Sequence, residues 1–440
     1  MKNSNDHKKS QLYYVKTFGC QMNVSDSERI AGFLELHKLK PAKNINEADL
    51  VIFNTCGVRQ MAEDRVYGQI HNLRLKNKDL RLKIILTGCL AKRPDVIKRL
   101  KSKADLFTDI KNFQKNILES KILNLKSSLR CVNDYLNLKP KYSTPFSAYV
   151  PIMTGCNNFC SYCIVPYARG REIYRSASKI LNEIKKLVKD GYKEIILLGQ
   201  NVNSYKDGKT NFSKLLKEID DIKGNFWVSF ISNHPKDVTA EMIEAVAKCK
   251  KVCECFHLPI QAGNDEIIRK MNRKYTARKY LELVEKIKKA FAKHKPSMLY
   301  SITSDIIVGF PGETRKQFLD SAEIMRKAKY DMVYFGQYSS RPGTAAWNIK
   351  DNISKAEKVR REKYLNEILK KTCFENNQKY IGKNLDVIVD SYKNGFYFGR
   401  TRTMKNVKLE SKKKNLIGEI IKVKVIKANI WNLEGITTKA

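Results

Sequence analysis

Three cysteines fall within eight residues of the segment TGCNNFCSYCIVPYARGR, residues 154–171, in the pattern C-x₃-C-x₂-C. Structural zinc usually takes four ligands from paired C-x₂-C units, and no fourth Cys or His lies nearby in the sequence. A 4Fe-4S cluster takes one thiolate per iron, so Cys156, Cys160 and Cys163 would leave one iron open. The spacing therefore predicts a cluster whose open iron binds a substrate or a cofactor.

Three further cysteines each end a short apolar run that is followed by polar, helix-competent sequence: LYYVKTFGCQMN, ADLVIFNTCGVR and LKIILTGCLAKR. Cys20, Cys56 and Cys89 are separated by 36 and 33 residues, the length of one βα unit. Parallel strands of a doubly wound sheet would bring these thiols to one crevice. One buried cysteine at a strand end is ordinary packing, whereas three in register indicate a shared metal ion or cluster.

From residue 148 onward six more β-like runs alternate with helical sequence, and each run ends in polar residues and Gly or Pro. This pattern is typical of a parallel barrel whose βα loops form an active site. Six units predict a partial (βα)6 barrel. The runs are AYVPIMTGC, EIILLGQNVNSY, FWVSFISNHP, CFHLPIQAG, YSITSDIIVGFPG and MVYFGQYSSRPG.

The ends of these runs supply the candidate cofactor-binding residues, which are Gln200, Asn203, His257, Gln261, Asp305, Gly309 and Pro311. A packed role for His257 is an equal alternative, and the GFPG turn also suits a plain chain reversal. Arg169, Arg171 and Arg175 follow the cysteine loop and either bind carboxylate or phosphate groups or are solvated. The set C-x₃-C-x-C at 249–255 straddles a helix end and a strand start, so its cysteines are interpreted as structural.

With 440 residues the chain is long enough for two to three domains. We predict an N-terminal α/β domain over 11–115 and a linker over 116–147, in which Cys131 is interpreted as structural. The partial barrel follows over 148–372. Short alternating strands with Gly turns predict a small antiparallel β-barrel over 376–440.

The formal net charge of +39 predicts attraction to polyanions, of which nucleic acid is the commonest in the cytosol. The alternative is the codon bias of an AT-rich genome, because 63 Lys far outnumber 21 Arg. Arg400, Arg402 and Lys405 are candidate RNA contacts near the aromatic Tyr397 and Phe398, which equally suit a barrel interior. The polar start of the chain and the lack of a long apolar run predict a cytoplasmic protein.

The motifs TGCNNFCSYCIVPYARGRE, LLGQNVNSY, LPIQAGND, SDIIVGFPGET and YSSRPGTAA, in this order, resemble those of the radical S-adenosylmethionine methylthiotransferases, and the resemblance covers nearly the whole chain. It implies that the C-x₃-C-x₂-C loop holds the radical-generating 4Fe-4S cluster, which S-adenosylmethionine chelates. It also implies that the three N-terminal cysteines hold an auxiliary 4Fe-4S cluster and that a TRAM-like C-terminal domain grips tRNA. No side chain is assigned a catalytic role. Asn233 and Ala262 depart from the family pattern without affecting the cluster ligands.

Within that family, GCQMN, NTCGVR and GQNVNSY are most similar to the branch that converts N(6)-isopentenyladenosine next to the tRNA anticodon to its 2-methylthio form. Two alternatives use the same chemistry, on threonylcarbamoyladenosine in tRNA or on a ribosomal protein. An alternative of another class is a non-catalytic zinc and RNA-binding protein. The resemblance implies a monomeric transferase whose partners are the tRNA anticodon stem-loop, a reductant such as flavodoxin or ferredoxin, and an iron-sulfur or sulfur donor, with no membrane partner.

Overall fold

The computed structural model describes residues 11–58, 60–76, 82–120, 122–123 and 134–438, so Cys131 lies outside the described residues. The chain forms two compact units. The first comprises residues 1–143 and 163–171, and the second comprises residues 144–162 and 172–440. Within the described ranges, we find no helix that is both long and apolar enough to traverse a bilayer.

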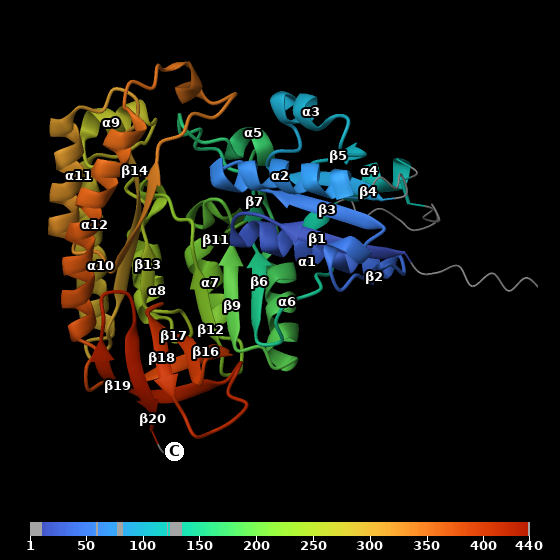
Figure 1. Cartoon of the computed structure of the whole chain (residues 1–440). Helices are drawn as coiled ribbons and strands as arrows, with labels where there is room; N and C mark the ends of the chain where they lie inside the picture. Colours follow the sequence, from blue (N-terminus) through green and yellow to red (C-terminus); the bar gives the residue numbers. More distant parts are fainter. Residues whose placement is uncertain (1–10, 59, 77–81, 121, 124–133, 439–440) are drawn as a thin grey trace, which may run out of the picture. The chain divides into compact units, whose positions relative to one another are not determined.

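A five-stranded parallel sheet organises the first unit (Figure 1). Its strand order, β2-β1-β3-β4-β5, changes direction between β1 and β3, which makes it doubly wound with its topological switch point there. The predicted N-terminal fold is therefore confirmed. The elements are β1 (Leu12–Thr17), α1 (Gln21–Leu36), β2 (Lys40–Pro41), β3 (Leu50–Thr55), α2 (Gln60–Lys76), β4 (Lys83–Gly88), α3 (Pro94–Leu100), β5 (Leu106–Phe107) and α4 (Phe113–Glu119).

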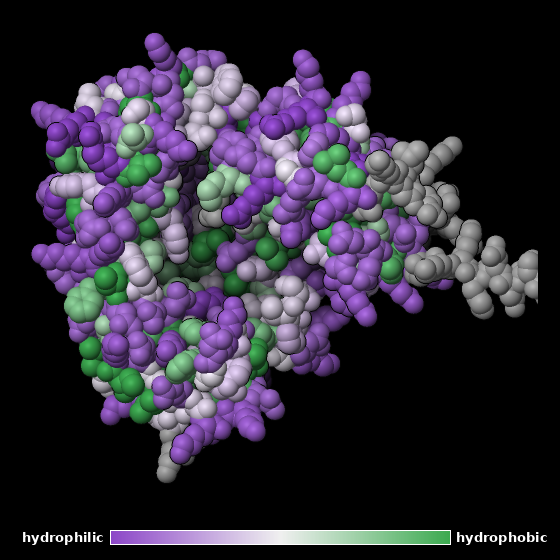
Figure 2. Space-filling model, in the orientation of Figure 1, coloured by the Kyte–Doolittle hydropathy of each residue, from purple (hydrophilic) through white to green (hydrophobic). Residues whose placement is uncertain are grey.

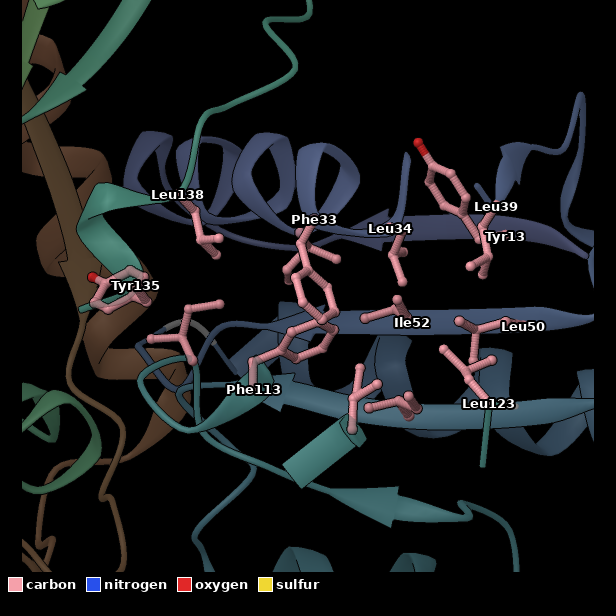
Figure 3. Packing of buried hydrophobic residues seen from close by; sticks show 14 of the residues in the cluster. Tyr13, Phe33, Leu34, Leu39, Leu50, Ile52, Phe113, Leu123, Tyr135 and Leu138 are labelled. Carbon is pink, nitrogen blue, oxygen red and sulfur yellow. The ribbon is translucent and has the colours of Figure 1, made fainter. Parts of the chain in front are cut away.

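Strand β3 is buried along its whole length, as expected for a parallel strand that is covered on both faces. Ile52 packs into one hydrophobic cluster, whereas Val51 and Phe53 pack into another, because successive side chains of a strand point to opposite faces. Figure 3 shows the first cluster, in which the rings of Phe33 and Phe113 meet edge to face with their centroids 6.2 Å apart.

Part of the segment predicted as a linker belongs to this core. Tyr135 and Leu136 lie in a short 3₁₀ helix (Tyr135–Asn137) and are buried, with Leu138, in the cluster that contains Phe33. A few isolated apolar residues show no period, which is why the sequence pattern did not reveal this packing.

Six parallel strands form the partial barrel of the second unit, and all six predicted runs are confirmed. They form two sets in the orders β12-β9-β6 and β13-β14-β15, and a parallel bridge from Val228 to Val252 joins the sets. The strands are β6 (Ser147–Pro151), β9 (Glu194–Leu198), β12 (Trp227–Phe230), β13 (Cys255–His257), β14 (Ser301–Val308) and β15 (Met332–Gln337), and a small hairpin pairs β7 (Met153–Thr154) with β8 (Ile173–Tyr174).

Helices separate these strands in the chain, as a βα barrel requires. Helix α11, for example, begins with a capping box in which the side chains of Thr314 and Gln317 satisfy free backbone amides. The helices are α5 (Val165–Arg169) in the first unit and α6 (Ala177–Lys189), α7 (Phe212–Asp220), α8 (Ala240–Lys248), α9 (Asp265–Lys270), α10 (Ala277–His294), α11 (Arg315–Ala328) and α12 (Lys355–Gln378) in the second.

The C-terminal strands close into a five-stranded barrel, which confirms the predicted TRAM-like fold. One pairing differs from the antiparallel prediction: β18 and β20 run parallel, because β19 intervenes between them in the chain. The strands are β16 (Asn384–Lys393), β17 (Phe396–Thr401), β18 (Asn406–Glu410), β19 (Ile420–Ala428) and β20 (Leu433–Thr437).

Figure 2 shows that hydrophilic residues cover most of the visible surface, with hydrophobic residues among them.

Candidate iron-sulfur and cofactor sites

The three N-terminal cysteines lie at the carboxyl ends of three neighbouring parallel strands of the first unit. Cys20 follows β1 and is the N-cap residue of α1, while Cys56 and Cys89 directly follow β3 and β4. In sheets of this kind ligands bind beyond the carboxyl ends of the strands, at the switch point. The structure therefore places the three predicted thiols at one edge of the sheet.

Gly19 lets two of these loops approach each other. Its φ angle is +112°, and a Cβ at this position would lie 2.5 Å from Cβ and 2.9 Å from Sγ of Cys56. A residue with a side chain would be strained by the backbone conformation and would also collide with Cys56.

The three thiols influence one another electrostatically. Desolvation raises the pKa of Cys89; the positive charge of Arg169 opposes this shift and the neighbouring Cys56 adds to it. Desolvation also raises the pKa of Cys20, again opposed by Arg169 and reinforced by Cys89. Among the described residues, no three His, Cys, Asp or Glu side chains are grouped closely enough to hold a single metal ion. Three thiols at one edge of the sheet match the donors of a cluster that takes one ligand per iron, and their assignment as ligands stays a prediction.

A buried polar network adjoins Cys20, and sequence reasoning did not identify it as a unit. Asn23 Nδ2 donates to the carbonyl oxygens of Phe18 and Thr55 at 2.7 and 2.9 Å. Its Oδ1 therefore faces the other way, where it accepts from Arg169 Nη2 at 2.8 Å and lies 3.8 Å from Cys20 Sγ. Arg169 Nη2 also donates to Asp26 Oδ2 at 2.6 Å. Asn23 is the last residue of the motif GCQMN, but no sequence pattern predicts the pairing of Asp26 with Arg169.

The C-x₃-C-x₂-C loop crosses from one unit to the other, with Cys156 and Cys160 in the second unit and Cys163 in the first. Cys156 and Cys160 are buried, and desolvation raises the pKa of Cys156. Asn158 Nδ2 donates to Cys156 Sγ at 3.5 Å, and Arg273 Nη1 donates to Cys160 Sγ at 3.4 Å. Hydrogen bonds of this kind stabilise negative charge on sulfur.

Arg273 is a second residue that sequence reasoning missed. It follows α9, and its Nε and Nη2 donate to Tyr275 Oη and to the carbonyl oxygen of Pro259, each at 2.9 Å. The adjacent Asn272 donates to the carbonyl oxygen of Phe159 inside the cysteine loop at 2.8 Å. The residues after α9 therefore support the loop, although they lie more than a hundred positions away in the sequence.

Three of the predicted cofactor-binding residues lie close together where β13 ends beside the middle of β14. His257 shares a hydrogen bond of 2.8 Å between Nδ1 and Thr303 Oγ1, and its Nε2 lies 3.5 Å from Asp305 Oδ2. Gln261 donates from its backbone amide to the carbonyl oxygen of Asp305 at 2.9 Å. Polar groups therefore converge where β13 ends.

Gln200 and Asn203, which follow β9, have structural partners. Gln200 Oε1 accepts from the backbone amide of Gly155, next to Cys156, so it supports the cysteine loop. Asn203 uses both ends of its amide on the backbone of His234, donating at 2.9 Å and accepting at 3.0 Å.

Gly309 and Pro311 form the turn after β14. Gly309 has φ +72°, and a Cβ there would lie 2.6 Å from Cγ of Lys358, so the turn packs closely on α12. Pro311 is buried. The cofactor contacts of all seven candidates stay predictions.

The three predicted RNA-binding residues join the C-terminal barrel to the partial barrel. Their carboxylate partners lie at the amino-terminal ends of β9, β13 and β15, opposite to the cysteine loop. Each partner is buried. The pairs are Arg400 with Glu194, Arg402 with Glu254 and Lys405 with Asp331. The RNA contact predicted for these cations remains untested, and in this structure internal carboxylates neutralise their charge.

Comparison with known proteins agrees with this architecture. Residues 150–325 match the Radical SAM superfamily, residues 12–109 match uncharacterized protein family UPF0004, and residues 378–437 match the TRAM domain. The tRNA-2-methylthio-N(6)-dimethylallyladenosine synthase of Clostridium botulinum (strain Hall) is 42% identical over 442 residues, covering 96% of each chain. The protein belongs to the tRNA-2-methylthio-N(6)-dimethylallyladenosine synthase family. The synthase of Thermoanaerobacter pseudethanolicus is 39% identical and covers 97% of this chain and 93% of its own.

Solved structures of radical SAM enzymes share the fold of this synthase-family chain. The methyltransferase TsrM from Kitasatospora setae, with cobalamin and a [4Fe-4S] cluster bound, gives a TM-score of 0.52 at 13% identity, covering 77% of this chain and 74% of its own. The cobalamin-dependent enzyme OxsB gives 0.52 at 9% identity, covering 82% of this chain and 56% of its own. At these identities the likeness concerns the fold alone.

Proposed function

We propose that this protein is a tRNA methylthiotransferase. It converts N(6)-dimethylallyladenosine, also called N(6)-isopentenyladenosine, next to the anticodon into its 2-methylthio derivative. The observation that supports this most directly is the presence of two separate sets of three cysteines, beside the strand ends of two parallel sheets, in a chain of this synthase family. S-adenosylmethionine and two 4Fe-4S clusters are its cofactors.

The reaction requires these cofactors because carbon 2 of adenine carries an unactivated hydrogen that no side-chain base removes. The bound cofactors supply a carbon-centred radical, made from S-adenosylmethionine, and the sulfur that enters at carbon 2. The protein holds the cofactors, orients the base and keeps water away from the radical. Two sets of thiols match these two requirements, with one set for the radical and the other for sulfur.

In the radical half, Cys156, Cys160 and Cys163 would hold one cluster. Arg273 donates a hydrogen bond to the sulfur of Cys160 and would support it as a cluster ligand. His257 and Asp305 offer hydrogen-bonding groups for the amino, carboxylate or hydroxyl groups of S-adenosylmethionine, because His257 ends β13 and Asp305 lies beside it on β14.

In the first unit, Cys20, Cys56 and Cys89 would hold the auxiliary cluster. Burial of Cys56 and Cys89 limits the access of solvent to such a site. Gly19 keeps the loops of Cys20 and Cys56 in close approach, which the shared site requires.

The C-terminal barrel provides the tRNA contacts in this proposal. Since Arg400, Arg402 and Lys405 pair with internal carboxylates, the phosphate backbone meets the exposed lysines instead. Lys412, Lys413 and Lys414 are consecutive and exposed in the connection between β18 and β19. Exposed cations of this kind supply most of the affinity for nucleic acid.

The remaining partners follow from the chemistry. A radical enzyme of this class needs a one-electron reductant such as flavodoxin or ferredoxin, and repeated turnover needs an iron-sulfur or sulfur donor. We infer that the protein acts as a monomer in the cytoplasm.

Two measurements test the proposal. Nucleosides from the tRNA of cells with and without the gene are compared, and loss of the 2-methylthio-dimethylallyladenosine peak is expected. An unchanged peak would favour threonylcarbamoyladenosine or a ribosomal protein as the target. Anaerobic reconstitution should give about eight irons per chain, the content of two cubane clusters. Zinc without sulfide would identify a non-catalytic zinc and RNA-binding protein.

A further inference from the structure

Arg169 is buried beside the thiols of the first unit with part of its hydrogen-bonding capacity unused. Only 4% of its side chain is exposed. Nη2 donates to Asn23 and Asp26, whereas Nη1 is buried and makes no hydrogen bond of normal geometry. An unsatisfied buried donor on a charged group costs free energy, so such an arrangement favours a ligand that completes it.

The surrounding residues hold Arg169 in place. Asp26 is 1% exposed and anchors Nη2 at 2.6 Å. Asn23 cannot rotate its amide to help Nη1, because its Nδ2 already donates to two backbone carbonyl oxygens. These hydrogen bonds therefore fix the orientation of the Arg169 guanidinium, including its free nitrogen.

The network also places the guanidinium next to a thiol. Asn23 Oδ1 lies 2.8 Å from Arg169 Nη2 and 3.8 Å from Cys20 Sγ, so Arg169 and Cys20 share one oxygen atom. The side chain of Arg169 also lies close enough to the Cys89 thiol to interact with it directly, and its charge acts on Cys20. An anion that completes this site therefore lies beside Cys20 and Cys89, and sulfur anions suit the soft metals that thiolates bind.

We propose that Arg169 binds the anionic sulfur species at the auxiliary site, a sulfide or an alkyl thiolate, by donating a hydrogen bond from its free Nη1. The inference rests on the proposed function, because it requires iron at the three thiols. Arg169 holds the sulfur by charge and direction, and Asn23 and Asp26 are positioning residues that act through Arg169.

The test uses the full-length chain with Cys156, Cys160 and Cys163 replaced by alanine, so that only the auxiliary site can take up iron. After anaerobic reconstitution, methanethiolate is titrated and its binding is followed by the electron paramagnetic resonance of the reduced cluster. Arg169→Gln in this background should bind methanethiolate about ten- to a hundredfold more weakly, the expected effect of losing a charged hydrogen bond. Arg169→Lys, which keeps the charge but lacks the second terminal nitrogen, should bind with intermediate affinity.

Arg93→Gln is the matched control, since Arg93 is also buried and pairs with Glu63 at 2.7 Å in the same unit. It should lower stability without changing methanethiolate affinity. Equal affinity in the parent and in either Arg169 variant would overturn the inference, and so would an equal loss in Arg93→Gln. If Arg169→Gln takes up no iron, the methanethiolate affinity of Arg169→Lys is compared with that of the parent, and weaker binding by the variant supports the inference. Absence of iron from the parent itself would refute the auxiliary cluster, and with it the proposed function.

Discussion

The guanidinium of Arg400 makes two hydrogen bonds of 3.1 Å to the carboxylate of Glu194, which is 0% exposed. Glu194 opens β9 of the partial barrel, and Arg400 belongs to β17 of the C-terminal barrel. The contact therefore fixes one barrel on the amino-terminal end of the other, away from the strand ends that carry the cysteine loop.

Arg400→Gln should destabilise the protein by about 3 kcal/mol, because it leaves a buried carboxylate without its cation. Urea unfolding measures the change. Lys424→Gln on the exposed face of β19 is the control and should change stability by less than about 0.5 kcal/mol. Equal stabilities of the two variants would contradict an organising role for this pair.

Replacing Lys412, Lys413 and Lys414 with Gln should weaken tRNA binding while stability stays unchanged. Each cation that neutralises a phosphate steepens the slope of log affinity against log salt concentration. Removing the three lysines should therefore reduce the magnitude of this slope by roughly two. Filter binding of the tRNA over a salt series gives this slope. A triple variant with the parental slope would show that tRNA binds elsewhere on the protein.

Gly19→Ala should remove the auxiliary site selectively. The added Cβ collides with Cys56, and the left-handed backbone conformation costs of order 1–3 kcal/mol more for alanine than for glycine. Reconstituted iron should fall from about eight to about four per chain, the content of one cubane. Gly68→Ala in α2, where an added Cβ meets nothing within 4 Å, should retain the full iron content.

Arg273→Gln should make the radical-generating cluster harder to reduce, because a hydrogen bond to a ligand sulfur stabilises the added electron. We expect reductive cleavage of S-adenosylmethionine to slow by about tenfold or more, the usual effect of losing an outer-shell partner. A redox titration followed by electron paramagnetic resonance measures the potential. Arg402→Gln, which breaks a buried pair with Glu254 at the other end of the barrel, should lower stability and leave the potential unchanged.

His234 makes the stability of the protein sensitive to acid. Burial, together with the positive charges of Arg273 and Lys236, lowers the pKa of His234 to about 2. Its Nδ1 accepts from the backbone amide of Lys236, and its ring meets that of Tyr275. The unfolded chain binds a proton below a pKa of about 6.5 that the folded chain excludes, so the free energy of unfolding decreases as the pH falls.

From this histidine alone we expect a loss of about 2 kcal/mol between pH 7 and pH 5. His234→Asn keeps an acceptor for the Lys236 amide and should reduce the pH dependence of unfolding by that amount, as measured by urea titration of matched preparations. The same pH dependence in both proteins would show that His234 takes up a proton in the folded state.

The repeated patterns of the sequence were sufficient to predict the fold and the placement of the N-terminal thiols. Cys20, Cys56 and Cys89 recur at the spacing of a βα unit, and that spacing brings them to the same edge of a parallel sheet. The six barrel strands were found in the same way, since each combines a short apolar run with a polar end.

Interactions between distant segments were not predictable, because no local pattern encodes them. Arg169 and Asp26 are separated by 143 residues, and Arg273 and Cys160 by 113. Charge density also did not predict the partners of individual residues: Arg400 and Arg402 stand in a basic stretch, yet each pairs with a buried carboxylate from another part of the chain.

Residues 163–171 belong to the first unit although the segments on both sides of them belong to the second. The first unit is therefore not encoded by one contiguous stretch of the gene. A single crossover between residues 143 and 163 would therefore separate Arg169 from Asp26, whereas a crossover after residue 171 would keep the pair together.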